Sequence, residues 1–212
     1  MTIVKDGYPF ILVPLIVAIV LILLMSGNVA VFISLICFLL SAFCMFFFRD
    51  PNIKITEGNG LILSPCNGTV LEVKENDNGQ SVIRVFLSVF DVHLQRSPIS
   101  GTVKSVEYRP GKFLKAHEPE AHIVNEQNLI TIENENGTYI VKQVAGILAR
   151  RCVSWVKQGD VLKIGDKIGL IKFSSQVDLH MPTDYDIKVK VGDKVVSGVT
   201  VFATILENGD KK

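Results

Sequence analysis

The chain has 212 residues, which is room for one domain of ordinary size and an appendage but not for two large soluble domains. Its formal net charge of +1 argues against a nucleic-acid partner, because such proteins usually carry a strongly basic patch or stripe. The 4 cysteines form no Cys-x-x-Cys motif and no Cys/His cluster, so neither a disulfide framework nor a zinc site is expected. We therefore predict no metal site and a reducing compartment.

The N-terminal quarter of the chain is apolar and carries no charge between residues 7 and 48. Within it, apolar runs at 10–25 and 29–48 are separated by a short polar turn. At 1.5 Å per residue the second run is about 30 Å long, enough to cross a bilayer, whereas the first reaches about 24 Å. We therefore predict that residues 1–48 form a helical hairpin that is transmembrane, or re-entrant in its first arm, with both ends on one side of the membrane.

Basic residues flank this apolar stretch. Lys5 precedes it and Arg49 and Lys54 follow it. Because Lys and Arg are enriched at the cytoplasmic ends of membrane helices, we expect the rest of the chain on the cytoplasmic side of the plasma membrane. A secretory signal peptide would have an apolar core of about 7–15 residues and no second apolar run. A buried hairpin of a soluble protein is the other alternative, and the complete lack of charge argues against it.

Residues 49–212 change to short β-branched runs separated by Gly, Asn and Pro. Turn signals such as Asn78-Gly79 and Asn136-Gly137 recur too often for long helices. The pattern predicts a mainly β fold, a compact, barrel-like antiparallel domain. The expected strands are 61–63, 69–73, 82–86, 129–132, 139–144, 168–173, 187–191 and 199–206.

Several side chains in this region could carry chemistry. They are His93, the pairs Arg150-Arg151 and Asn125-Glu126, and the consecutive hydroxyls Ser174-Ser175. A lone histidine in a strand is more often structural than catalytic, and two serines after a strand usually begin a turn. Paired arginines are mostly solvated, although they suit bidentate binding of carboxylate or phosphate. The remaining histidines have no metal-ligand spacing and are interpreted as surface or packing residues: His117, His122 and His180.

An ordered set of motifs runs from about residue 46 to residue 182. The segments are Phe47-Phe48-Arg49-Asp50-Pro51, Ser64-Pro65-Cys66-Asn67-Gly68-Thr69-Val70, Asp91-Val92-His93-Leu94-Gln95-Arg96-Ser97-Pro98-Ile99-Ser100-Gly101, Asn125-Glu126, Ala149-Arg150-Arg151 and Gly169-Leu170-Ile171-Lys172-Phe173-Ser174-Ser175-Gln176-Val177-Asp178. In this order they resemble the motifs of the short phosphatidylserine decarboxylases. The resemblance implies a membrane-associated, pyruvoyl-dependent enzyme. Its substrate would be phosphatidylserine, or an ether-lipid analogue with the same headgroup, and its product the ethanolamine lipid.

The resemblance further implies that the chain makes its own cofactor. Oγ of Ser175 would attack the carbonyl of Ser174, the chain would be cut between these two residues, and Ser175 would become a pyruvoyl group. That group would accept the electrons released as carbon dioxide leaves.

The same resemblance assigns roles to the other motif residues. His93 would be the base or proton donor. Arg150 or Arg151, together with Asn125 and Glu126, would bind the phosphate or carboxylate of the headgroup.

Two residues depart from the family pattern. Ser174 stands where the family usually has Gly, which adopts strained backbone conformations more readily. Asn67 stands where the family usually has an Asp that orients and charge-stabilises the histidine, and an amide cannot offset an imidazolium charge. Asp91 could substitute, although alternate residues of a strand point the same way without necessarily touching.

The implied partners are the phospholipid substrate, the membrane, and the large and small chains of one precursor, and a homo-oligomer is left open. An inactive membrane-bound relative is one alternative, favoured by Ser174 and Asn67. A membrane-tethered lipoyl or biotinyl carrier is the other, suggested by similar Gly-Asp strand repeats at 156–168 and 189–205.

Overall fold

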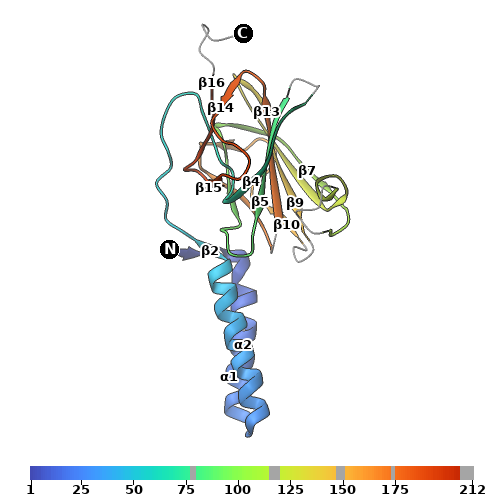
Figure 1. Cartoon of the computed structure of the whole chain (residues 1–212). Coiled ribbons are helices and arrows are strands. Elements are labelled where there is room, and N and C mark those ends of the chain that lie inside the picture. Colours follow the sequence, from blue (N-terminus) through green and yellow to red (C-terminus); the bar gives the residue numbers. More distant parts are fainter. Residues whose placement is uncertain (77–79, 115–119, 147–150, 173–174, 206–212) are drawn as a thin grey trace. The chain divides into compact units, whose positions relative to one another are not determined.

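The computed structural model describes residues 1–76, 80–114, 120–146, 151–172 and 175–205 (Figure 1). The chain divides into two compact units, Met1–Asn52 and Ile53–Lys212. In the first unit, β1 (Thr2–Ile3) pairs with β2 (Arg49–Asp50), which keeps this short ribbon with the apolar helices.

The first unit is built on a pair of apolar helices. After a 3-10 turn, η1 (Lys5–Gly7), α1 runs over Tyr8–Leu24, and α2 runs over Asn28–Phe47. The helical segments Lys5–Leu24 and Asn28–Phe47 each have 20 residues and a hydropathy of 2.7, so both are long and apolar enough to cross a membrane. The first arm is longer than its apolar run, because the η1 turn extends it to about 30 Å.

Close packing and one hydrogen bond hold the helices together. Ser41 Oγ donates to the Ile11 carbonyl at 2.8 Å, which satisfies a hydroxyl in an apolar setting. Gly7 lies against Phe48, where an added Cβ would come within 2.5 Å of that side chain. Most other large side chains of the helices are exposed, as expected for a lipid-facing surface.

The second unit is mainly β, which confirms the predicted fold class. Its elements are β3 (Leu61–Leu63), β4 (Gly68–Asn76), β5 (Gln80–Leu87), β6 (Leu94–Arg96), β7 (Gly101–Arg109), α3 (Ala121–Val124), β8 (Gln127–Asn134), β9 (Gly137–Ala145), β10 (Cys152–Ser154), β11 (Val161–Leu162), β12 (Lys167–Ile171), β13 (Ser175–Pro182), β14 (Tyr185–Ile187), β15 (Lys194–Val195) and β16 (Val201–Ile205). An eight-stranded antiparallel sheet has the order β11-β7-β8-β9-β13-β5-β4-β15 and curls into a half-barrel (Figure 1). Two three-stranded sheets, β10-β12-β6 and β14-β16-β3, complete the unit.

The central strand β13 shows how the sequence builds this unit. Val177, Leu179 and Met181 belong to the buried apolar core. The alternating residues Gln176, Asp178 and His180 therefore project from the other face of the sheet. β13 is hydrogen-bonded to β5 on one side and to β9 on the other, and its first residue lies level with the ends of both strands.

Candidate active site

Ser175 is the first residue of β13 and lies at one end of the half-barrel. Its backbone is paired with Leu87 of β5 and Ala145 of β9, and the residue is 0% exposed. Its Oγ is buried and has no hydrogen-bond partner among the described residues. A buried hydroxyl without a partner is costly, so this atom is better suited to chemistry than to holding the fold. Ser174, the other predicted cleavage residue, lies outside the described residues.

His93 is held in a defined orientation by its own main chain. The residue is 0% exposed, and Nδ1 lies 3.0 Å from the main-chain oxygen of Asp91. Because a carbonyl oxygen can only accept, this contact assigns the proton of a neutral ring to Nδ1 and makes the buried Nε2 the basic nitrogen. The His93 carbonyl in turn accepts hydrogen bonds from Gln95 Nε2 at 2.7 Å and Ile171 N at 3.3 Å.

The Asp91 carboxylate bonds Ser88 and not His93, the partner that its sequence position suggests. Oδ2 accepts hydrogen bonds from the main-chain nitrogen and the hydroxyl of Ser88, both at 2.8 Å. The Asp91 nitrogen donates back to the Ser88 carbonyl at 2.9 Å, which closes a tight turn after β5. Asp91 therefore positions His93 through its main chain, while its carboxylate stabilises the preceding turn.

Asn67 directly precedes β4, whose first residues lie near Ser175 in the sheet. The pairings Thr69↔Phe86 and Ser175↔Leu87 put the start of β4 two strand spacings from Ser175, about 10 Å. Asn67 Oδ1 accepts a hydrogen bond from Ser197 N at 3.1 Å, and Ser197 Oγ donates to Pro65 O at 3.1 Å. The Asn67 side chain thus joins the loop before β4 to the loop before β16.

Asn125 and Glu126 form one wall beside the Ser175 strand. The Asn125 amide donates to Ala145 O at 2.7 Å and bonds Leu114 N and O at 2.8 and 2.9 Å. Glu126 Oε1 accepts from Cys152 N at 3.2 Å. Both side chains are buried and engage main-chain groups, so they shape this end of the half-barrel.

Of the two predicted arginines, the structure describes Arg151, which lies at the edge of this wall. Arg151 is exposed and directly precedes β10, next to the Glu126 contact. Its charged group is therefore available to a ligand at the surface. Arg150 lies outside the described residues.

Sequence reasoning missed a chain of buried amides next to His93. Gln143 Nε2 donates to Gln95 Oε1 at 2.8 Å, and Asn128 Nδ2 donates to Gln143 Oε1 at 2.8 Å. All three amides are buried. They connect β8 and β9 to β6, and the Gln95 bond extends the chain to the His93 carbonyl. Single Gln and Asn residues in separate strands form no recognisable sequence motif, so only the tertiary structure reveals this chain of amides.

Cys66 is a second residue that the sequence did not single out. It lies in the loop between β3 and β4 and belongs to the buried core. Burial raises the pKa of its thiol well above the usual value, and the carboxylates of Asp91 and Asp178 raise it further. The thiol therefore stays protonated at neutral pH and packs as a small apolar group.

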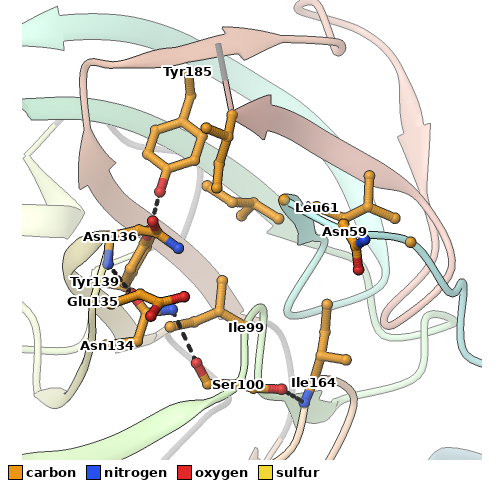
Figure 2. Close-up of a pocket in the computed structure, with 14 residues that line it drawn as sticks. Asn59, Leu61, Ile99, Ser100, Asn134, Glu135, Asn136, Tyr139, Ile164 and Tyr185 are labelled. Atoms are coloured by element: carbon orange, nitrogen blue, oxygen red, sulfur yellow. Dashed lines mark hydrogen bonds between the residues drawn. The ribbon is translucent and has the colours of Figure 1, made fainter. Parts of the chain in front are cut away.

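A cavity of about 370 Å³ lies at the other end of the half-barrel (Figure 2). The hydroxyls of Tyr139 and Tyr185 are hydrogen-bonded to each other at its wall. Tyr139 and Ala145 are at opposite ends of β9, about 20 Å apart, so the cavity is remote from Ser175. None of the described residues that line it is basic, which makes it unsuited to a phosphate.

Comparisons with known proteins identify the family. The phosphatidylserine decarboxylase family profile matches residues 40–203. The phosphatidylserine decarboxylase proenzyme of Ehrlichia chaffeensis is 37% identical over 207 residues, covering 94% of this chain and 89% of the relative. That of Solibacter usitatus is 41% identical over 169 residues (80% and 82%), and that of Carboxydothermus hydrogenoformans is 41% identical over 196 residues (89% and 92%).

These matches identify the β-rich unit with its apolar N-terminal hairpin as an enzyme of lipid metabolism. The chain belongs to the phosphatidylserine decarboxylase family. The family resemblance inferred from the ordered motifs is confirmed, and it displaces the alternative of a lipoyl or biotinyl carrier.

Proposed function

We propose that this chain is a phosphatidylserine decarboxylase that activates itself by cleavage between Ser174 and Ser175. The observation that carries the proposal is the place of Ser175, a buried hydroxyl with no partner among the described residues at the first position of the central strand. Its relatives are named as proenzymes, which agrees with a chain that must be processed before it acts.

The cleavage step requires a free hydroxyl and a base. Oγ of Ser175 attacks the carbonyl carbon of Ser174, a C–O bond forms, the peptide C–N bond breaks, and an ester joins the two parts of the chain. The hydroxyl proton goes to the base, which we assign to Nε2 of His93, and a proton is returned to the leaving nitrogen of residue 175. The Nδ1 contact to Asp91 supports this assignment, because it leaves Nε2 able to accept a proton. Loss of the Cα proton of residue 175 with rupture of its Cβ–O bond then cuts the chain: residue 174 leaves as a carboxylate and residue 175 becomes dehydroalanine, whose hydrolysis releases ammonia and gives the pyruvoyl group.

The surroundings of Ser175 fit a pyruvoyl group derived from it. A small carbonyl group in this position is enclosed by β5 and β9 and shielded from water. When formed, the group supplies an electron sink for the loss of carbon dioxide from an amino acid headgroup. His93 then holds the proton that replaces the lost carboxylate, and the buried amide chain keeps its main chain in place.

We assign headgroup binding to Arg151 at the edge of the wall beside the Ser175 strand, and retain Arg150, which precedes it in the sequence, as the other predicted arginine. The exposed guanidinium of Arg151 can bind a phosphate or carboxylate bidentately. Asn125 and Glu126 support this edge, because their side chains fix the main chain at Leu114, Ala145 and Cys152.

We further propose that the apolar hairpin anchors the enzyme in the plasma membrane, with the β unit on the cytoplasmic side. The flanking Lys5, Arg49 and Lys54 support this orientation. A catalytically inactive relative is the second candidate, and Asn67 is the residue that favours it, since its amide carries no charge to support an imidazolium.

An intact-mass measurement of the purified chain separates these two candidates. We expect two fragments, residues 1–174 and a small fragment that begins at residue 175 with a blocked amino terminus. The Ser175→Ala chain should remain whole at 23.4 kDa and release no carbon dioxide from phosphatidylserine, whereas a Ser105→Ala control should be processed normally. Cleavage of Ser175→Ala at the same bond would refute the assignment, and an uncut, inactive wild-type chain would favour the inactive relative.

A further inference from the structure

A charged pocket of about 270 Å³ lies on the face of the eight-stranded sheet that is turned away from the core. Its walls come from four adjacent strands and from α3. Strand pairing puts Glu72 of β4 opposite Arg84 of β5, Arg84 opposite Asp178 of β13, and Asp178 opposite Lys142 of β9. Acidic and basic side chains therefore alternate in one row across the sheet.

The hydrogen bonds among the described residues of this row leave one carboxylate oxygen without a donor. Arg84 bonds both Glu72 and Asp178, the latter from Nε to Oδ1 at 3.2 Å. Gln176 Nε2 also donates to Asp178 Oδ1 at 2.6 Å. Asp178 Oδ2 is buried and accepts no hydrogen bond from the described residues.

Lys142 forms a long ion pair with this oxygen but no hydrogen bond. Lys142 Nζ lies 4.0 Å from Asp178 Oδ2 and donates instead to the His122 carbonyl of α3 at 2.5 Å. Burial lowers the pKa of Lys142, and the Asp178 charge only partly opposes this effect. A buried carboxylate oxygen without a donor is costly, so the pocket is built to receive a cationic N–H group.

The remaining walls favour anions. Lys74 is exposed at the pocket rim, and His180 lines the wall beside Asp178. The pocket is lined by three Lys and Arg side chains and two carboxylates, an excess of one basic group. These are Lys74, Arg84 and Lys142, and Glu72 and Asp178. The complementary ligand therefore carries one ammonium group and two anionic groups, with a net negative charge.

We propose that this pocket is a second binding site, separate from Ser175, for a ligand of the phosphoserine class. Its ammonium group meets Asp178 Oδ2, and its phosphate and carboxylate meet Lys74, Arg84 and His180. The site is separate because Asp178 projects from the opposite face of β13 to Ser175 and lies about 10 Å further along the strand.

The charge pattern itself requires only a zwitterion with two anionic groups, and the choice of the serine headgroup rests on the proposed function. Two sources share this chemistry, the headgroup of phosphatidylserine and free O-phosphoserine. Either ligand would act on the strand that begins with Ser175, which gives the pocket a means of regulating cleavage or turnover.

Binding can be tested on the full-length Ser175→Ala chain, which forms no pyruvoyl group that could capture an amine. Calorimetry in an uncharged detergent should show O-phospho-L-serine binding about 10-fold more tightly than inorganic phosphate, because only the former supplies an ammonium group for Asp178. In the same background Lys74→Glu should weaken binding of O-phospho-L-serine about 10-fold. Lys163→Glu makes the same charge change at an exposed position outside the pocket and should have no effect.

Asp178→Asn should remove the preference for O-phospho-L-serine over phosphate while phosphate binding is retained. Because Asp178 is buried, this variant can fail to fold, and the exposed Lys74→Glu then carries the test. Equal affinities of Lys74→Glu and Lys163→Glu for O-phospho-L-serine, or no binding to either chain, would overturn the proposal.

A second arm distinguishes the sources of the ligand. The Ser175→Ala chain is placed in phosphatidylcholine nanodiscs with phosphatidylserine or with phosphatidylglycerol, and hydrogen exchange of β4 and β13 is compared. Protection by phosphatidylserine alone, lost in Lys74→Glu, identifies the lipid, whereas protection only by added O-phosphoserine identifies the soluble ligand. Binding is measured on Ser175→Ala and decarboxylase activity on the wild type, so the two proposals can fail separately. Ligand binding by Ser175→Ala with no decarboxylase activity in the wild type would refute only the proposed function. Activity in the wild type with no ligand binding by Ser175→Ala would refute only the second site.

Discussion

Nδ1 of His93 lies 3.0 Å from the main-chain oxygen of Asp91, whereas the Asp91 carboxylate is directed to Ser88. The two residues are thus coupled through the backbone. The carboxylate of Asp91 acts on His93 by fixing the turn that delivers the oxygen, so its shape as a hydrogen-bond acceptor matters more than its charge.

This relationship predicts different effects for two substitutions of Asp91. Asp91→Asn keeps an oxygen that can accept from Ser88 N, so its cleavage half-time should remain within a few-fold of the wild type. Asp91→Ala removes both hydrogen bonds to the turn and should slow cleavage about 10-fold, because less exact positioning of His93 raises the activation free energy by about 1.4 kcal/mol. Half-times can be measured by gel or mass spectrometry. An Asp91→Asn chain that stalls as severely as Asp91→Ala would show that the charge itself supports the ring.

Asn67→Asp should accelerate self-cleavage. The new carboxylate can still accept the hydrogen bond from Ser197 N, and it restores the negative charge that the family resemblance assigns to this position for stabilising the imidazolium form of His93. We expect a rise of up to about 10-fold in the cleavage rate, equivalent to about 1.4 kcal/mol. Asn67→Ala is the matched control, since it loses the Ser197 contact without adding charge. A rate unchanged in Asn67→Asp would indicate that the missing family carboxylate has no influence on this site.

Gln143→Leu should destabilise the β unit by about 2–3 kcal/mol. The substitution leaves Gln95 Oε1 and Asn128 Nδ2 buried without their Gln143 partner, and unmade buried hydrogen bonds cost about 1–3 kcal/mol each. Chemical denaturation in detergent measures the loss. Gln158→Leu, at an exposed position, is the control and should change the unfolding free energy by less than about 0.5 kcal/mol. Similar stabilities of the two variants would contradict a role for the amide chain.

Acidification should destabilise the β unit through His180. Burial lowers the pKa of His180 below its ordinary value of 6.5, while the nearby Asp178 charge opposes the shift. The folded state then holds the neutral ring, so stability is fully present above about pH 6.5 and is lost as the pH falls below that value. His180→Asn, which cannot take up a proton, should show a smaller loss between about pH 7 and pH 5. Thermal unfolding without ligand at these two pH values provides the measurement, and identical losses in both chains would rule out His180 as the source.

Local features of the sequence were sufficient for the family and for the general architecture. The uncharged stretch from residue 7 to residue 48 predicted the helical hairpin, because charge is so costly inside a bilayer that its absence is informative by itself. The recurrent Gly and Asn turns predicted an antiparallel β unit, and the ordered motifs around His93 and Ser175 predicted the decarboxylase family. All of these signals lie within short segments.

The contacts between these segments were decided only by the tertiary structure. β13 lies between β5 and β9, strands distant from it in the chain, and this order brings Asp178 between Arg84 and Lys142. A period-two pattern shows which face a residue occupies but not which strand lies beside it, because register depends on the packing of the whole sheet. For the same reason the sequence could not show that Ser197 would bind Asn67, or that Asp91 would reach His93 through its main-chain oxygen while its carboxylate bonds Ser88.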